Sequence, residues 1–400
     1  MDTALNIVWL CPYPLDVLTS SGLRLTRPAG GHACSWIINL ASALAARPGV
    51  ELHLVTCSAK VMRSQTVRYQ GYTVHVIRDA IPFTDRSWAG LMHADAWMQF
   101  WLRKRRLLST IKAVSPDLVH GHGTEDAYAL TAVHSGTPAV VSIQGVIAEV
   151  NKSNPALRYR LVERLERRTI LRTQYAFCRT AFDTGFVQSV NPSARVFQIH
   201  EAMNPVFFKQ RWAGCARPRL LFVGSFEEHK GLNYLLQALA LLSKEDPGVE
   251  LCVVGGDATD IAAARCYCRA LGIEQRVEFA GFLPAEAIAE RHLSCRAFVI
   301  PSTNDNSPNA LAEAMVSGMP CVASAVGGIP SMIADEDTGL LFRAADVSQL
   351  AARLRLLLHD DERCRVLGAA AAKTAHSRHL PEAVAEATVA AYRAILADAA

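Results

Sequence analysis

The chain has 400 residues and a formal net charge of +4; half of its residues are hydrophobic and a fifth are charged. This length predicts two or three domains with substantial cores, and the composition excludes a disordered or fibrous chain. The small net charge gives no indication of a nucleic-acid partner. None of the 11 cysteines has the C-x-x-C spacing of a zinc site, so we expect no such metal site and reduced cytoplasmic thiols.

The start of the chain predicts neither a secretory signal nor a membrane span. Asp2 stands where a signal peptide would be basic, and the apolar run Leu5–Leu10 is too short. No run approaches the roughly 20 apolar residues that a transmembrane helix needs. We therefore expect a cytoplasmic protein.

Short apolar runs alternate with longer amphipathic runs along the whole chain. The runs that predict strands in the first half are Asn6–Leu10, Glu51–Thr56, Thr73–Ile77, Leu118–Gly121, Ala139–Ile143, Tyr175–Cys178 and Val196–Ile199. Those in the second half are Leu220–Gly224, Glu250–Gly255, Val277–Ala280, Ala297–Pro301, Pro320–Ser324 and Gly339–Phe342. Helical periodicity lies between them, for example at Leu232–Leu242, Thr259–Leu271 and Val347–Leu358. This alternation predicts an α/β fold with parallel sheets.

The strand–helix pattern restarts near Arg219, which predicts two Rossmann-like domains whose parallel sheets face each other across a cleft. We assign residues 1–199 to the first domain, 200–217 to a linker and 218–379 to the second domain. Residues 380–400 predict a last helix, which packs back on the first domain or lies on the second. In such sheets, ligands bind at the carboxyl ends of the strands.

The stretch PSTNDNSPNALAEAMVSGMPCVAS, residues 301–324, combines a loop acid with a helix start. Asp305 follows a predicted strand, and Glu313 lies eight residues later in a helix. A helix that begins at Pro308 has three backbone N–H groups without intrahelical partners, those of Asn309, Ala310 and Leu311. Such a helix start attracts phosphate, and the two carboxylates can accept hydrogen bonds from sugar hydroxyls. The stretch therefore predicts a nucleotide-sugar site; two solvated carboxylates are the alternative.

A second strand, loop and helix start make up LLFVGSFEEHKGLNYLLQAL, residues 220–239. The strand ends at Gly224, and Lys230 lies where the helix begins. A lysine in this place can neutralise a diphosphate leaving group as charge develops on it. A P-loop is excluded, because His229 and Gly231 replace residues that its phosphate contacts require. A solvated lysine is the alternative.

Residues 301–324 resemble the acid-x7-acid signature of the retaining GT-B glycosyltransferases, specifically glycosyltransferase family 4. In that family the second acid is followed by Ala-Met, as in Glu313-Ala314-Met315. A Gly-x-Pro turn and a Gly-Gly pair come later, as in Gly318-Met319-Pro320 and Gly327-Gly328. Three positions depart from the family: Asp305 replaces the usual Glu, Ser225 replaces the usual Arg after Gly224, and Gln144 replaces the His of many relatives. The resemblance covers nearly the whole chain and is strongest over residues 219–345.

The resemblance implies a sugar transfer from a nucleoside-diphosphate sugar to a hydroxyl of a glycan or lipid-linked glycan, as in polysaccharide biosynthesis, with retention of anomeric configuration and no cofactor. It implies catalytic roles for Asp305, Lys230 and Gln144, which stands where many relatives carry His. The implied donor-binding residues, in the second domain, are Gly224, Ser225, Gly281, Phe282, Leu283, Ser307, Pro308, Asn309, Ala310, Leu311 and Glu313.

The resemblance makes the first domain the acceptor-binding domain. A glycine turn before the first long helix, a strand end and a later polar cluster would line the acceptor site, with the residues Gly30, Gly31, His122, Arg179 and Asp183. A structural role is the open alternative for His122 and for the polar cluster. A non-catalytic sugar-nucleotide-binding protein and a nucleotide-sugar epimerase are the alternatives for the whole chain.

Two predicted helices of the first domain are strongly basic. Arg103-Lys104-Arg105-Arg106 follows Trp97 and Trp101, and residues 158–172 hold six arginines. A basic helix with aromatic neighbours can bind an anionic membrane surface, here the inner face, where a membrane-linked acceptor would lie. A solvated helical face is the alternative.

Overall fold

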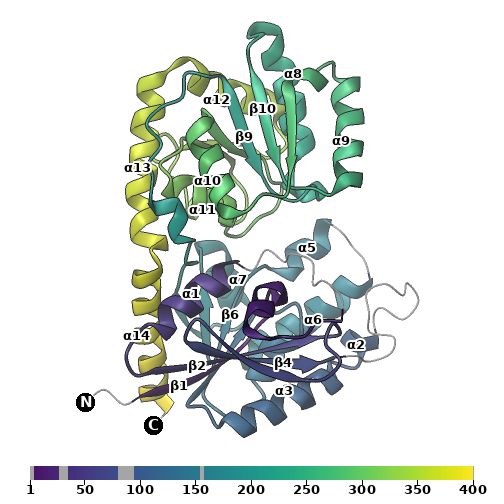
Figure 1. Cartoon of the computed structure of the whole chain (residues 1–400), viewed down its shortest axis with the longest axis vertical. Coiled ribbons are helices and arrows are strands. Elements are labelled where there is room, and N and C mark those ends of the chain that lie inside the picture. Colours follow the sequence, from purple (N-terminus) through teal and green to yellow (C-terminus); the bar gives the residue numbers. More distant parts are fainter. Residues whose placement is uncertain (1–3, 27–34, 80–93, 154–156, 400) are drawn as a thin grey trace. The chain divides into compact units, whose positions relative to one another are not determined.

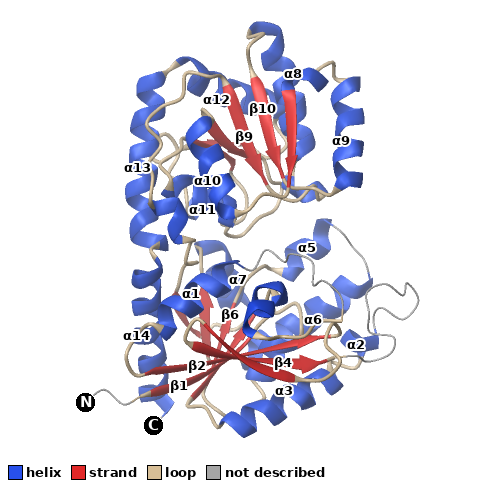
Figure 2. Cartoon of the chain, viewed as in Figure 1, coloured by secondary structure: helices blue, strands red, loops and turns tan. Residues whose placement is uncertain are grey.

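The chain forms two α/β units in the computed structural model (Figure 1). The structure describes residues 4–26, 35–79, 94–153 and 157–399. The first unit comprises Met1–Ala202 and Pro381–Ala400, and the second comprises Met203–Leu380. In each unit, helices cover a sheet (Figure 2), which confirms the prediction of two Rossmann-like domains.

The first unit is built on an eight-stranded sheet in the order β3-β4-β2-β1-β5-β6-β7-β8. All neighbouring pairs are parallel except β3 and β4. The central strands are almost wholly buried, as expected for a parallel sheet covered on both faces. The strands are β1 (Leu5–Leu10), β2 (Val50–Ser58), β3 (Gln65–Tyr69), β4 (Tyr72–Arg78), β5 (Leu118–His122), β6 (Ala139–Ser142), β7 (Tyr175–Cys178) and β8 (Arg195–Gln198).

Helices from both ends of the chain cover this sheet. The last helix, α14, packs against α1, and the wholly buried hydroxyl of Tyr392 accepts a hydrogen bond from Trp9 Nε1 over 2.8 Å. The structure therefore places the last helix on the first unit. The helical elements are η1 (Leu15–Ser21), α1 (Ser35–Ala45), α2 (Ala94–Trp97), α3 (Trp101–Val114), α4 (Ala127–Ala132), α5 (Ile147–Ser153), α6 (Leu157–Arg172), α7 (Ala181–Val190) and α14 (Pro381–Ala399).

The second unit is built on a six-stranded, fully parallel sheet in the order β11-β10-β9-β12-β13-β14. Its strands are β9 (Arg219–Val223), β10 (Glu250–Val254), β11 (Val277–Gly281), β12 (Ala297–Ile300), β13 (Cys321–Ser324) and β14 (Leu340–Phe342). Its helical elements are η2 (Pro205–Phe208), η3 (Glu228–Lys230), α8 (Leu232–Glu245), α9 (Ala258–Ala270), η4 (Glu274–Arg276), α10 (Ala285–Ser294), α11 (Asn309–Val316), η5 (Ile329–Ser331), α12 (Val347–His359) and α13 (Asp361–His379).

Every predicted strand is present, and two expectations need correction. The sequence did not predict β3, because its residues alternate between exposed and half-buried and form no compact apolar run. Most of the predicted linker belongs to the second unit, where Phe207 and Trp212 are buried in the core and Trp212 Nε1 donates to the Cys295 carbonyl over 2.9 Å. None of the described helices has the length and apolar composition to cross a membrane.

Candidate active site

Lys230 and Asp305 form an ion pair in the second unit. Lys230 ends η3 after strand β9, and Asp305 lies in the loop after the neighbouring strand β12. Because parallel neighbours end at the same edge of a sheet, the two loops meet there. Lys230 Nζ donates to Asp305 Oδ2 over 2.7 Å, and the side chains are 24% and 11% exposed. The two predicted catalytic residues of this unit are thus in direct contact.

A glycine and a backbone hydrogen bond hold these two loops together. Gly231 has a φ of 71°, and a Cβ at this position would lie 2.0 Å from the carbonyl oxygen of Pro301. The N–H of Thr303 donates to the His229 carbonyl over 2.8 Å. Only glycine fits this close approach, which fixes Lys230 beside the loop that carries Asp305.

The backbone and the carboxylate of Asp305 also have contacts apart from Lys230. A Cβ at Gly327 would lie 1.9 Å from the Asp305 carbonyl oxygen, and the N–H of Gly328 donates to that oxygen over 3.1 Å. The hydroxyl of Ser302 donates to Asp305 Oδ2 over 3.1 Å. The Gly-Gly pair therefore supports the loop acid. Sequence reasoning missed Ser302, although its place directly after a strand that leads to Asp305 was an available signal.

Helix α11 begins at Asn309, directly after Pro308, whose φ of −68° suits a helix start. No partner is seen among the described residues for the N–H groups of Asn309 and Ala310, whereas the N–H of Leu311 donates to the Pro308 carbonyl over 3.1 Å. The expectation of three free N–H groups is therefore wrong for Leu311, because the first turn closes on Pro308. Ser307 is buried just before the helix. Two backbone donors remain for an anion.

Glu313 lies one turn inside α11 and is half-buried. Its carboxyl group has no hydrogen-bond or ion-pair partner among the described residues, and burial raises its pKa to about 8. A partly buried carboxyl group without a partner is unfavourable for the fold unless something binds it. Ribose hydroxyls are suitable donors, so the position fits the predicted role.

The loops after β9 and β11 lie next to each other through Gly255. A Cβ at Gly255 would lie 2.0 Å from the Gly224 carbonyl oxygen, and its N–H donates to the Gly281 carbonyl over 2.7 Å. Phe282, directly after β11, is 77% exposed, so its ring is available to a flat ligand such as a nucleobase. Ser225 donates to Glu227 over 3.1 Å and supplies no positive charge.

The side chain of Leu283 is partly buried against the core of the second unit. Within the part of the chain that the structure describes, no three His, Cys, Asp or Glu side chains are grouped as metal ligands.

Most predicted residues of the first unit that the structure describes are buried. Gln144 lies half-buried in the turn between β6 and α5, at the carboxyl edge of the sheet. His122 ends β5, is 1% exposed and stacks on His120 with the ring centroids 3.8 Å apart. Burial lowers the pKa of His122 well below its usual value, so the ring is neutral. Its two nitrogens have no hydrogen-bond partner within the described part of the chain.

Arg179 and Asp183 are engaged in their own unit. Arg179 forms an ion pair with buried Glu201 at 2.9 Å and lies 4.6 Å from the ring centre of Trp36. Asp183 is fully buried and forms a capping box with Thr180 at the start of α7. The structure gives Asp183 a capping role, and its contact with the acceptor stays a prediction. Gly30 and Gly31 lie outside the described residues.

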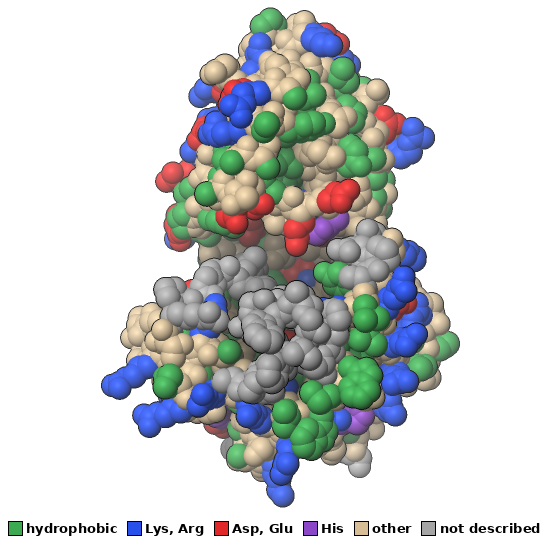
Figure 3. All heavy atoms as spheres, turned by 90° about the vertical axis from the view of Figure 1, so that its right-hand side faces the viewer, with side chains coloured by type: hydrophobic (Ala, Val, Ile, Leu, Met, Phe, Trp, Pro, Cys, Tyr) green, Lys and Arg blue, Asp and Glu red, His purple; other side chains and the backbone are tan. Residues whose placement is uncertain are grey.

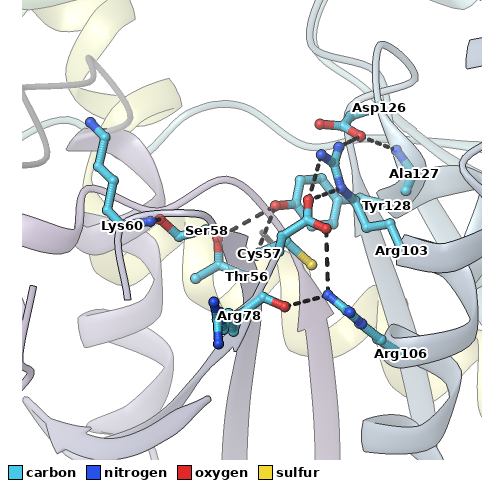
Figure 4. Close-up of polar contacts among 11 residues, drawn as sticks. Thr56, Cys57, Ser58, Lys60, Arg78, Arg103, Arg106, Asp126, Ala127 and Tyr128 are labelled. Atoms are coloured by element: carbon cyan, nitrogen blue, oxygen red, sulfur yellow. Dashed lines mark hydrogen bonds and ion pairs between the residues drawn. The ribbon is translucent and has the colours of Figure 1, made fainter. Parts of the chain in front are cut away.

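The basic run of α3 is partly turned toward its own unit (Figure 4). Arg103 bonds both Asp126 and Asp79, the latter at 2.6 Å, and Arg106 donates to the Arg78 carbonyl. Burying a charge is tolerated when it is paired in this way. Arg103 therefore holds the unit together and is not available to a membrane.

The basic face of α6 is different. Its exposed arginines without an ion-pair partner among the described residues are Arg160, Arg164, Arg168 and Arg172. Trp97 and Trp101, near the start of α3, are 76% and 53% exposed. On this side of the first unit, Lys and Arg side chains lie next to exposed hydrophobic side chains (Figure 3).

Comparison with known proteins gives matches over both units. Residues 209–374 match the family described as Glycosyl transferases group 1, and residues 35–204 match Glycosyltransferase Family 4. A D-inositol 3-phosphate glycosyltransferase from Corynebacterium aurimucosum is 36% identical over 155 residues, which are 38% of this chain and 37% of that protein. One from Nocardia farcinica is 27% identical over 283 residues, which are 63% and 61% of the two chains. The chain thus matches less than two thirds of the length of these relatives.

Two solved structures resemble the whole chain. Sucrose-phosphate synthase from Thermosynechococcus elongatus has a TM-score of 0.81 at 20% identity and covers 98% of this chain and 100% of its own. Anabaena Alr3699/HepE, in complex with UDP and glucose, has a TM-score of 0.69 at 17% identity and covers 97% and 99%. At these identities the likeness shows the fold, which is GT-B. With both units matched by the two family descriptions, the chain belongs to the group 1 glycosyltransferases of family 4.

Proposed function

We propose that this protein is a retaining glycosyltransferase that moves a sugar from a nucleoside-diphosphate sugar to an acceptor hydroxyl. The observation that carries the proposal is the Lys230–Asp305 ion pair at 2.7 Å together with the start of α11 and the carboxyl group of Glu313, which has no partner among the described residues. The donor's diphosphate supplies the anion for the first two features. The hydroxyl groups of the donor's ribose and sugar donate hydrogen bonds to the carboxyl groups of Glu313 and Asp305.

In the proposed reaction, the bond between the anomeric carbon and the diphosphate oxygen breaks while the acceptor oxygen bonds to that carbon on the same face. The acceptor's proton passes to the departing diphosphate, so no protein nucleophile is needed. Lys230 and the N–H groups at the start of α11 stabilise the charge that develops on the diphosphate. Asp305 and Gln144 hold the donor sugar, and Glu313 holds the ribose. The donor is a co-substrate, and the proposal includes no cofactor.

Names of similar proteins guide the choice of substrates to test. Alr3699/HepE was solved with UDP and glucose, so UDP-glucose is the first donor. D-inositol 3-phosphate enters the acceptor panel because it appears in the names of curated relatives. Sugar chains and lipid-linked sugars complete the panel.

We further infer that the acceptor is membrane-linked and that the protein works at the inner, cytoplasmic face of a membrane. The support is the row of exposed arginines on α6, which have no ion-pair partner among the described residues, together with the exposed rings of Trp97 and Trp101. Arginine side chains attract anionic headgroups, and tryptophan favours the membrane interface. Co-sedimentation with vesicles containing phosphatidylglycerol, but not with phosphatidylcholine vesicles, is the expected result; equal sedimentation with both contradicts it.

A transfer assay tests the main proposal. Purified protein is incubated with UDP-, GDP- and ADP-sugars, with and without acceptors, and the product's anomeric configuration is read by NMR. We expect nucleoside diphosphate release that rises with one acceptor, and an α-linked product from an α-linked donor. Donor binding in a thermal-shift screen without turnover would indicate a sugar-nucleotide-binding protein. Sugar interconversion without acceptor would indicate an epimerase. Either result contradicts the proposal.

A further inference from the structure

A buried carboxylate of the first unit lies against the segment that carries Gln144. Glu166, on α6, is 0% exposed. Its Oε1 accepts hydrogen bonds from the Thr124 hydroxyl over 2.6 Å and from the Ile147 N–H over 3.2 Å. Its Oε2 accepts one from the Ala148 N–H over 3.3 Å. One side chain thus joins α6, the loop after β5 and the start of α5.

Helix capping alone does not explain a carboxylate in this place. A helix start is usually capped by the side chain of the residue before it, as Asp126 caps α4. Here the cap comes from a different helix, and its burial is unfavourable enough to raise the pKa of Glu166 to about 7. The arrangement fixes the start of α5 relative to β5 and α6, which a local cap would not do.

Gln144 lies between two fixed points. On one side, the N–H of Ile143 donates to the Phe177 carbonyl over 3.0 Å, which ties the end of β6 to β7. On the other side, Glu166 holds the N–H groups of Ile147 and Ala148. The segment between these anchors is short, so a shift of the second anchor moves Gln144.

Resting on the proposed function, in which Gln144 contacts the donor sugar, we propose that Glu166 is a positioning residue for sugar transfer. It acts through the segment 143–148 and touches no substrate. Its removal therefore changes how well the sugar is held at the moment of reaction, and leaves the diphosphate contacts of the second unit intact. A misplacement of about 1 Å can cost on the order of a hundredfold in rate.

The test compares two Glu→Gln substitutions on helix α6. Glu166→Gln keeps the side-chain shape but replaces one acceptor oxygen with a group that cannot accept an N–H. Glu163→Gln is the matched control, because Glu163 lies one turn earlier on α6 and bonds Asn151 and Arg167. The measurements are kcat and KM for the donor, the kcat/KM ratio between two donor sugars, and the affinity for UDP.

For Glu166→Gln we expect kcat to fall about tenfold to a hundredfold. We also expect a changed sugar ratio, unchanged UDP affinity and wild-type values for the control. A purely structural role lowers the active fraction for all sugars alike and leaves the ratio unchanged. In a Gln144→Ala background, Glu166→Gln should add less than about twofold, because residues that act through one contact are not additive. Full additivity in that background overturns the proposal.

Thr124→Val keeps the test decisive if Glu166→Gln does not fold. It removes one of three donors to Glu166 and should lower kcat by about threefold to tenfold, with the same change in sugar ratio. If the wild type transfers sugar and both variants have the same kcat and the same sugar ratio as the wild type, the role of Glu166 is wrong but the proposed function stands. A wild type that transfers no sugar overturns the proposed function and this role together.

Discussion

The two units hold their polar residues in different ways. In the second unit, Lys230 and Asp305 bond each other, and Glu313 and the start of α11 have groups without partners among the described residues. In the first unit, Arg179 is paired with Glu201 and Asp183 caps a helix. The second unit thus keeps charged and hydrogen-bonding groups available for a ligand, whereas the first uses most of its own for the fold. The chemistry of the diphosphate is therefore expected to depend on single side chains of the second unit.

The largest effect is expected for Lys230→Ala. Charge on the leaving diphosphate grows in the transition state, so kcat should fall by about a hundredfold to a thousandfold, with a smaller change in KM. The control is Lys244→Ala, because Lys244 is exposed on α8 and has no ion-pair partner among the described residues. Steady-state kinetics with a fixed acceptor measures both. A change in KM alone would show that Lys230 only binds the donor.

The next effect concerns donor affinity. Glu313→Ala removes a half-buried hydrogen-bond acceptor, and affinity for UDP should fall by about tenfold to a hundredfold, which corresponds to about 1.5–3 kcal/mol. Calorimetry measures it, with Glu290→Ala on the exposed face of α10 as the control. Unchanged affinity would show that Glu313 does not bind the donor. Glu313 would then no longer distinguish the second unit from the first.

Asp305 sharpens the comparison through specificity. Asp305→Glu moves the carboxylate by about 1.5 Å, the length of one C–C bond, within a loop held by Gly327 and Gly328. We expect about a tenfold change in the kcat/KM ratio between two donor sugars. Asp305→Asn should lower activity with both donors alike, because it removes the charge that pairs with Lys230. An unchanged ratio for Asp305→Glu at full activity would mean that Asp305 does not contact the sugar.

For Asp183, in the first unit, we expect a loss of stability and little change in activity. Asp183→Ala removes the capping box of α7 and should lower the free energy of unfolding by about 1–2 kcal/mol. If the carboxylate serves only the start of α7, where it accepts hydrogen bonds from the N–H groups of Arg179 and Thr180, KM for the acceptor should stay within about twofold. Thermal denaturation and kinetics measure these. A large rise in KM without loss of stability would show that Asp183 contacts the acceptor.

The smallest effect is a pH dependence of stability. The pKa of Glu313 is about 8 in the folded protein, above the ordinary value of about 4.3 for an unfolded chain. Between these values the folded state binds one proton more than the unfolded state, so this group makes stability fall as pH rises from about 4.3 to 8. Glu313→Gln removes that dependence. The variant should melt a few °C above the wild type at pH 8 and near it at pH 5; a constant difference across this range would contradict it.

The strands and the loop and helix start of residues 301–324 were predictable because their signals are continuous in the sequence. Apolar runs indicated every strand except β3, which has an alternating exposed edge, and residues 301–324 hold both acids and the helix start together. The first unit was harder, because its partners come from distant segments: Glu201 for Arg179, Asp79 for Arg103 and Tyr392 for Trp9. No local pattern shows that a polar residue will be paired by one more than twenty positions away.

The most direct test of the central claim compares nucleoside diphosphates with their nucleosides by calorimetry. UDP, GDP and ADP are each titrated against uridine, guanosine and adenosine, with wild type and Lys230→Ala. We predict that one diphosphate binds at least about tenfold more tightly than its nucleoside, and that Lys230→Ala removes most of this difference. Equal affinity of every diphosphate and its nucleoside in the wild type would contradict a diphosphate site at Lys230 and the start of α11.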